Sequence, residues 1–103
     1  MTGPKSEMRI DKWLWAVRIY KTRSQAAEEC KKGRILIDNM AVKPSRIIKP
    51  GDTIIVRKLP VIYIYKVKNT LNSRISAKLV PDYYENLTPE EEFLKLISEN
   101  RGN

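Results

Sequence analysis

The chain has 103 residues, a length that suits one domain and leaves too little apolar material for two separate cores. Its 20 lysines and arginines against 12 acidic residues give a net charge of +8, and residues 1–80 carry 18 of these cations and only six of the anions. This charge suits a polyanionic partner, whereas the lack of histidine and the single cysteine argue against a structural zinc site, an internal disulfide and histidine-based catalysis.

The N-terminal part of the chain predicts a lead-in followed by a helix. Residues 1–8 show no hydrophobic periodicity and contain glycine and proline, so we expect them to be disordered. The helix that follows carries an apolar stripe at the spacing i, i+3, i+4 and i+7, made of Ile10, Trp13, Leu14 and Val17. We expect this stripe to face the core.

A second helix is predicted from about Arg23. Thr22 and Gln25 have the spacing of a capping box, in which the threonine hydroxyl accepts a backbone N–H of the first turn. The inward face of this helix is small and includes Cys30, which we interpret as a core residue. The helix should end before Gly33, because glycine readily adopts the left-handed conformation of a C-terminal cap.

Beyond Gly33 the pattern changes from helical to extended. Residues 35–37 and 40–42 are largely apolar and flank the turn sequence Asp38-Asn39, which predicts a hairpin. Pro44 should then direct the chain out of the sheet, because proline cannot donate a ladder hydrogen bond.

Two longer strands are predicted over residues 53–57 and 61–68. A tight turn at residues 49–52 precedes the first strand. The second strand places Tyr63 and Tyr65 on one face and aliphatic residues on the other. An aromatic face can serve as a platform for RNA bases, but we favour coverage by a closing helix.

The last third of the chain predicts a loop and an acidic closing helix. Residues 69–76 are polar, and Pro81 interrupts an ambiguous segment. Thr88 and Glu91 form a second capping-box pattern, with proline at the first helical position. The closing helix is expected to dock on the sheet through an apolar stripe of Phe93, Leu94 and Ile97.

Several function classes are excluded by what the sequence lacks. No segment approaches the roughly 20 apolar residues that span a bilayer, and no signal-peptide pattern is present. The acidic pairs within 28–29 and 90–92 are interpreted as solvated surface, and no glycine-rich phosphate loop is found. We therefore expect a cytoplasmic protein with no membrane partner, no metal, no cofactor and no enzymatic activity.

The basic residues cluster in the helical pair and the segment after it. Residues 9–49 hold 11 cations and four anions, the local excess that phosphate binding requires. Neutral hydroxyl and amide side chains of the same segment can add hydrogen bonds to phosphate or ribose. The candidate RNA-binding residues are Arg9, Lys12, Arg18, Lys21, Thr22, Arg23, Gln25, Lys31, Lys32, Arg34, Lys43, Ser45 and Arg46. Trp15 lies off the apolar stripe, so both burial and base stacking remain open for it.

Four successive motifs resemble the S4-type RNA-binding domain: RIDKWLW at 9–15, KTRSQA at 21–26, KGRI at 32–35 and VKPS at 42–45. Within that superfamily, the DKWLW and KPS runs are similar to the ribosome-associated heat-shock protein fifteen family. The resemblance implies an RNA-facing set of Arg9, Lys12, Lys21, Thr22, Arg23, Lys32, Arg34, Lys43 and Ser45. Family members continue into a long basic extension, whereas this chain has a short acidic helix.

The resemblance also implies the fold class and the partners. It predicts a small α+β module with two N-terminal helices packed on a short antiparallel or mixed sheet, and a C-terminal helix. We expect an S4-like RNA-binding domain over residues 9–68 and an extension over residues 69–103. The implied partners are ribosomal RNA on the large ribosomal subunit and, as a further candidate, transfer RNA, in the rescue or recycling of stalled subunits under stress.

The expected function is therefore that of a non-catalytic, monomeric RNA-binding protein. Two alternatives remain open. One is an RNA-binding accessory module of an RNA-modifying or RNA-processing enzyme, with catalysis supplied by another chain and the acidic helix as the docking element. The other is a general nucleic-acid-binding regulator that also binds DNA.

Overall fold

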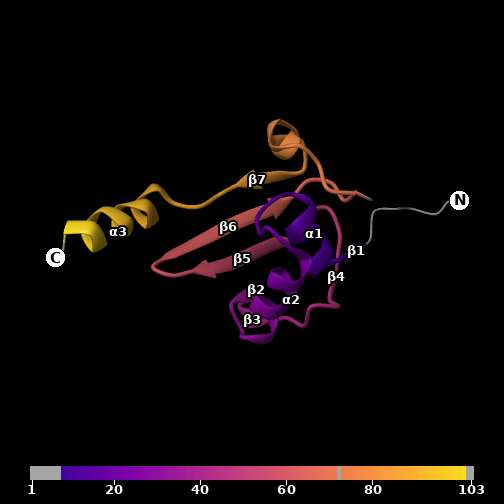
Figure 1. Ribbon diagram of the computed structural model, residues 1–103, viewed down its shortest axis with the longest axis horizontal. Coiled ribbons are helices and arrows are strands. Elements are labelled where there is room, and N and C mark those ends of the chain that lie inside the picture. Colours follow the sequence, from indigo (N-terminus) through magenta and orange to yellow (C-terminus); the bar gives the residue numbers. More distant parts are fainter. Residues whose placement is uncertain (1–7, 72, 102–103) are drawn as a thin grey trace, which may run out of the picture.

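The computed structural model describes residues 8–71 and 73–101. The expected lead-in therefore lies outside the described residues, except for Met8, which forms part of a strand. In chain order the elements are β1 (Met8–Arg9), α1 (Ile10–Ala16), α2 (Arg23–Lys31), β2 (Ile35–Ile37), β3 (Met40–Ala41), β4 (Ile47–Ile48), β5 (Thr53–Lys58), β6 (Val61–Val67), the 3-10 helix η1 (Ala77–Asp82), β7 (Tyr84–Asn86) and α3 (Glu90–Arg101) (Figure 1).

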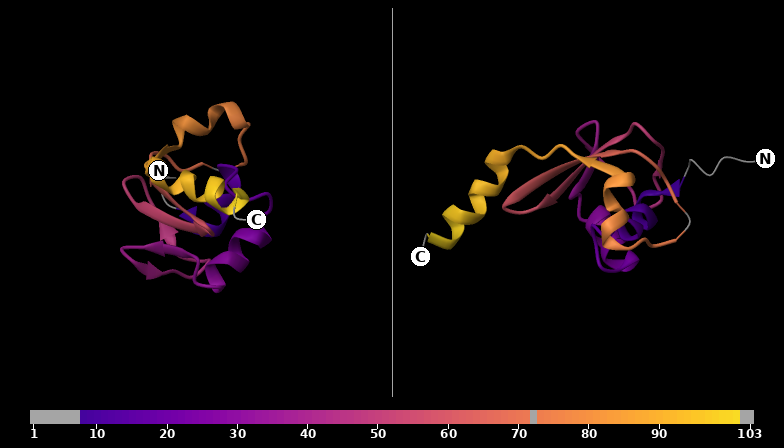
Figure 2. Two further views of the ribbon diagram at one scale, coloured as in Figure 1. Left: turned by 90° about the vertical axis from the view of Figure 1, so that its left-hand side faces the viewer. Right: turned by 90° about the horizontal axis from the view of Figure 1, so that it is seen from above.

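The architecture is an antiparallel sheet with the helical pair packed on it. Five strands run in the order β3-β2-β5-β6-β7, and every pairing between neighbours is antiparallel. The strands β1 and β4 form a separate antiparallel pair that joins the start of α1 to the segment before β5. Figure 2 shows α1 and α2 together on one side of the sheet. The predicted α+β class, with two N-terminal helices packed on an antiparallel sheet and a C-terminal helix, is confirmed.

The helical pair follows the sequence prediction closely. The stripe of Ile10, Trp13, Leu14 and Val17 is fully buried, in one cluster with apolar residues of β2, β5 and β6. The Thr22 hydroxyl accepts a hydrogen bond from the Gln25 amide at 3.0 Å, so the N-terminal cap of α2 is confirmed. Gly33 has φ +78°, the left-handed conformation expected after the helix.

The predicted hairpin forms between β2 and β3. Asp38 and Asn39 both have positive φ angles, of 55° and 63°, which suits the two-residue turns that match the twist of antiparallel strands. The tyrosines of β6 stack at 6.0 Å between the ring centroids of Tyr63 and Tyr65. The Tyr65 ring is covered by Tyr84 of β7 at 4.6 Å rather than by a helix, because β7 adds to the sheet beside β6.

The polar segment after β6 is fastened to α1 and the joint that follows it. The Trp13 indole donates to the Asn69 carbonyl oxygen at 3.0 Å, and the Ile75 amide donates to the Ala16 carbonyl oxygen at 3.1 Å. The Arg74 guanidinium donates to the carbonyl oxygens of Trp15 and Tyr20. Non-local hydrogen bonds of this kind satisfy carbonyl groups at the end of the helix.

The closing helix α3 differs from the prediction in its cap and its docking. The Thr88 hydroxyl accepts from the Ile64 amide at 2.9 Å, which ties the helix entry to β6. Phe93 contacts Tyr63 edge to face, but the expected docking is wrong for Leu94 and Ile97, which are 57% and 52% exposed. The reason is visible in Figure 1: β7 already occupies the place beside β6, and α3 projects beyond the sheet.

Candidate nucleic-acid interface

A buried carboxylate organises the centre of the basic surface. Asp11, in the first turn of α1, accepts hydrogen bonds from Nε and Nη2 of Arg9 at 3.2 and 2.9 Å, and its other contact is Nη2 of Arg23 at 3.5 Å. The Asp11 side chain is 4% exposed, whereas those of Arg9 and Arg23 are 46% and 45% exposed. Two guanidinium groups from different elements are thus held together while part of each faces solvent, where a phosphate can approach.

The turn at residues 43–46 lies beside this arginine pair. The Ile10 amide donates to the Arg46 carbonyl oxygen at 2.7 Å, and the Asp11 amide donates to the Pro44 carbonyl oxygen at 3.3 Å. The pairing of Arg9 with Ile47 between β1 and β4 reinforces this contact. The backbone amides at the start of α1 therefore fix the turn that carries Lys43, Ser45 and Arg46.

These three residues also line a hollow of about 310 Å³ between the turn and the β2–β3 hairpin. Lys43, Ser45 and Arg46 are exposed, as a surface contact to a polyanion requires. The structure therefore brings Lys43, Ser45 and Arg46 together beside the start of α1, which carries Asp11.

A second hollow, of about 350 Å³, joins the α1–α2 joint to the end of β5. Arg18, Lys21 and Gln25 line it, together with Lys58. Arg18 has φ +69° and donates from Nη1 to the Ile75 carbonyl oxygen at 3.2 Å, so its guanidinium is partly engaged. Lys58 Nζ donates to the Ile19 carbonyl oxygen at 2.7 Å and lies 4.5 Å from the centre of the Tyr20 ring.

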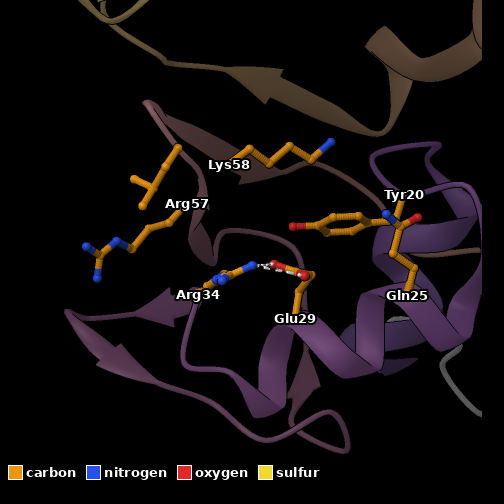
Figure 3. Close-up of a pocket in the computed structure, with 7 residues that line it drawn as sticks. Tyr20, Gln25, Glu29, Arg34, Arg57 and Lys58 are labelled. Carbon is orange, nitrogen blue, oxygen red and sulfur yellow. Dashed lines mark hydrogen bonds and ion pairs between the residues drawn. The ribbon is translucent and has the colours of Figure 1, made fainter.

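Arg34 lies at a third hollow, of about 560 Å³, which shares Tyr20, Gln25 and Lys58 with the second. Its Nη1 contacts both carboxylate oxygens of Glu29, at 3.2 and 3.4 Å (Figure 3). The Arg34 side chain is 47% exposed, so the ion pair orients the guanidinium without covering it.

The remaining predicted residues are not gathered in these hollows. Lys12 is half-buried on α1, and Lys31 and Lys32 are exposed at the end of α2. The Thr22 hydroxyl oxygen accepts the hydrogen bond that caps α2. The hydroxyl can still donate its proton in a hydrogen bond to a ligand. Trp15 is half-buried beneath Arg74, whose guanidinium carbon lies 6.0 Å from the ring centre.

The sequence reading missed four residues that shape this surface. Asp11, Tyr20, Arg57 and Lys58 are not among the site residues predicted from the sequence. The Arg9-x-Asp11 spacing is a usable signal for the first, because the two side chains bond each other directly. Contacts between Tyr20 and the end of β5 depend on tertiary structure and leave no local pattern.

Other site types find no support in the described ranges 8–71 and 73–101. No group of three or more potential metal-ligating cysteine, aspartate or glutamate side chains occurs there. No helix in the same ranges is long and apolar enough to cross a membrane. Cys30 is buried, and burial together with nearby carboxylates raises the pKa of its thiol to about 11, as expected of an unreactive core residue.

The part of the chain that matches known proteins includes most of this basic surface. The family model of the S4 domain matches residues 8–54, which contain the arginine pair, both helices, the hairpin and the 43–46 turn. Heat shock protein 15 of Escherichia coli is 42% identical over 55 residues, or 53% of this chain and 41% of that protein. This chain therefore spans less than half the length of that relative.

Two further relatives match more of their own length. The RQC P-site tRNA stabilizing factor of Halalkalibacterium halodurans is 35% identical over 75 residues, which cover 70% of this chain and 85% of that protein. The solved structure of Vibrio cholerae heat shock protein 15, described as trimeric, matches with a TM-score of 0.75 and 29% identity over 86% of this chain and 88% of that chain.

Proposed function

We propose that this chain, which belongs to the S4-domain family that includes heat shock protein 15 and the RQC P-site tRNA stabilizing factors, is a non-catalytic protein that binds structured ribosomal RNA on the large ribosomal subunit. Transfer RNA is its second proposed partner, because the similar protein of Halalkalibacterium halodurans is named as a factor that stabilises P-site tRNA. The proposed role is the rescue or recycling of stalled subunits in the cytoplasm.

The observation that carries this proposal is the arginine pair held by Asp11. Its two guanidinium groups come from the strand before α1 and the first turn of α2, and both remain half-exposed. Planar guanidinium groups match the oxygens of a phosphate, and fixing their orientation in the free protein lowers the entropy lost on binding. The surrounding cations add attraction to an RNA backbone that does not depend on sequence.

The mode of recognition follows from the shape of the surface. The cations lie on two helices, on the joint between them and on the 43–46 turn rather than on one helix that enters a groove. A surface of this kind suits a folded RNA whose phosphates and 2′-hydroxyl groups are displayed across a junction or a shallow minor groove. The proposed binding unit is the monomer, because one chain supplies all the residues of the surface.

Co-sedimentation of the purified protein with separated ribosomal subunits tests this proposal. We expect selective migration with the large subunit, lost in the Arg23→Ala/Arg34→Ala variant and retained in the Lys66→Ala/Lys78→Ala variant, which removes the same charge away from the proposed surface. Equal binding to both subunits, or no binding to either, would contradict it. Light scattering measures the molar mass of the free protein in solution. We expect the mass of a monomer, and the mass of a trimer would contradict the proposed binding unit.

A second candidate function rests on α3. Its apolar residues Phe93, Leu94, Leu96 and Ile97 are 37% to 57% exposed, and its first turn is acidic. An accessory module of an RNA-modifying enzyme would use such a helix to dock on the catalytic chain. Capture of a stoichiometric enzyme partner that withstands ribonuclease and is lost in the Leu94→Ser/Ile97→Ser variant would favour this candidate.

A further inference from the structure

The hollow of about 560 Å³ beside α2 has a lining unlike that of an ordinary surface depression. It lies where the end of α2 and the start of β2 meet the end of β5 (Figure 3). Its polar lining consists of Tyr20, Gln25, Glu29, Arg34, Arg57 and Lys58. Three cations against one carboxylate leave a net charge of +2 around a space of this size.

One buried hydroxyl in this pocket has no partner. Tyr20 is 4% exposed, and its hydroxyl oxygen is buried with no hydrogen-bond partner within the described part of the chain. Figure 3 shows the hydroxyl pointing into the pocket, between Lys58 and the Arg34–Glu29 pair. A buried donor without an acceptor destabilises a fold, so its position here is better explained by a ligand than by stability.

The donors around this hydroxyl define the ligand chemistry. The pocket offers guanidinium, ammonium and hydroxyl donors, and its only carboxylate already pairs with Arg34. The guanidinium of Arg57 is exposed at the outer edge and has no partner among the described residues. Leu59, 66% exposed on the rim, provides an apolar contact of the kind that a ribose or base adjoining a phosphate can use.

We propose that this pocket binds one phosphate of an RNA chain, at a site distinct from the Asp11-held arginine pair. The Tyr20 hydroxyl donates to a phosphate oxygen, and Lys58 adds positive charge beside the tyrosine ring. Arg34 supplies a guanidinium donor, and Arg57, whose exposed guanidinium points away from Tyr20 in the free protein, turns inward to supply a second. This inference rests on the proposed function for the identity of the ligand as RNA. It assigns a role to Tyr20, Arg57 and Lys58 that the basic helical surface alone does not require.

Access to the hydroxyl requires only a small rearrangement. The hydroxyl is covered by the side chains around it, so a phosphate that reaches it must displace one of them. Arg34 is the side chain free to move, since it is half-exposed and held by an ion pair at the surface, where such pairs are weak. Burial, followed by the charge of Glu29, raises the pKa of Tyr20 well above its usual range, so the hydroxyl remains a donor at physiological pH.

The decisive variant is Tyr20→Phe in the full chain, with Tyr63→Phe as the matched control. Removing only an unpaired hydroxyl leaves the charge unchanged and should leave the folded state at least as stable. We expect Tyr20→Phe to weaken binding to a folded ribosomal RNA fragment about three- to tenfold. The log–log salt slope should stay at its wild-type value, because the slope counts phosphates neutralised by cations and the variant removes none. Tyr63→Phe should change neither quantity.

A variant that removes one positive charge from the pocket tests the same proposal independently. Arg57→Gln should weaken RNA binding and flatten the salt slope more than Lys78→Gln, which removes the same charge from an exposed position outside the pocket. Unchanged affinity in both Tyr20→Phe and Arg57→Gln, with wild-type RNA binding intact, would overturn the pocket assignment and leave the proposed function standing.

A test without RNA distinguishes a failure of the phosphate pocket from a failure of the proposed function. Titration of the wild-type protein with inorganic pyrophosphate, followed by NMR, should shift the signals of Tyr20, Arg34 and Arg57, and Tyr20→Phe should weaken that response. If the wild-type protein binds no ribosomal RNA but shows this response, the proposed function fails and the phosphate pocket remains. A pyrophosphate response that is absent, or that Tyr20→Phe does not alter, would count against the pocket.

Discussion

The Asp11 carboxylate accepts two hydrogen bonds from the Arg9 guanidinium, at 3.2 and 2.9 Å, while it is itself almost completely buried. A buried carboxylate is stable only when its charge is compensated, and here the compensation comes from groups that retain exposed surface. The acidic residue therefore strengthens a basic surface, because it fixes the direction of Arg9 and, at 3.5 Å, of Arg23.

The Asp11→Asn variant should weaken RNA binding although it makes the protein more positive. Neutralising Asp11 removes the charge that orients Arg9 and Arg23, and we expect a loss of about three- to tenfold in affinity, or ~1 kcal/mol, with a comparable loss in folding stability. Fluorescence anisotropy with a labelled ribosomal RNA fragment measures the first effect. Asp82→Asn makes the same charge change on η1 and serves as the control; tighter binding by Asp11→Asn would show that net charge alone governs affinity.

The Thr22 cap should contribute measurably to stability. Thr22→Ala removes the acceptor of the Gln25 amide and should lower the free energy of unfolding by about 1 kcal/mol. Urea denaturation monitored by tryptophan fluorescence measures this loss. Ser24→Ala, an exposed position two residues after Thr22 in the same first turn, should change the midpoint little. Equal midpoints for the two variants would mean that the cap does not stabilise α2.

Arg74 should hold the segment after β6 against the helical pair. Its guanidinium donates to the carbonyl oxygens of Trp15 at 3.1 Å and Tyr20 at 3.4 Å, and Arg74→Met leaves both acceptors without this donor. We expect a loss of about 1–3 kcal/mol in unfolding free energy. Lys78→Met, on the exposed part of η1, is the matched control, and an Arg74→Met protein as stable as this control would refute the role.

The contact between α3 and β6 should weaken in acid. The Ile62 amide donates to the Glu92 carboxylate at 2.8 Å, and this bond, followed by the hydrogen bond from Lys95, lowers the pKa of Glu92 below its usual range. A carboxylate with a lowered folded-state pKa stabilises the fold above its unfolded-state pKa, and this contribution disappears as the pH falls through the folded-state value.

The Ile62 amide proton reports this titration directly. Its NMR chemical shift should follow the protonation of Glu92 as the pH falls from about 6 to about 3, with a midpoint below that of a free glutamate. In Glu92→Gln the dependence should disappear. An Ile62 signal that ignores pH in the wild-type protein would exclude the hydrogen bond in solution.

Local sequence patterns predicted the parts of the fold that local energetics determine. The apolar stripe from Ile10 to Val17, the cap at Thr22, the left-handed Gly33 and the Asp38-Asn39 turn each depend on residues within one or two turns of chain. The pairing of β1 with β4 is only two residues long, and its existence depends on the fold of the 37 residues between the two strands. No alternation within so short a segment can indicate it.

The same distinction applies to the candidate surface. The excess of cations between residues 9 and 49 is visible in the sequence, and the structure places most of them around α2, the α1–α2 joint and the 43–46 turn. The Asp11 link to Arg23 and the Tyr20 hydroxyl beside the end of β5 are tertiary relationships. The docking of α3 was mispredicted because an amphipathic stripe indicates burial without naming its partner, and β7 had taken that place.

The most direct test of the central claim is the salt dependence of binding to folded ribosomal RNA. If six to eight phosphates are contacted, a plot of log affinity against log salt should have a slope of roughly −5 to −7. We expect Arg9→Gln/Arg23→Gln to reduce that slope by about two contacts and to weaken binding at least tenfold, while Lys66→Gln/Lys78→Gln has a much smaller effect. A wild-type slope near zero, or equal losses in the two double variants, would contradict an RNA-binding surface built on the Asp11-held arginine pair.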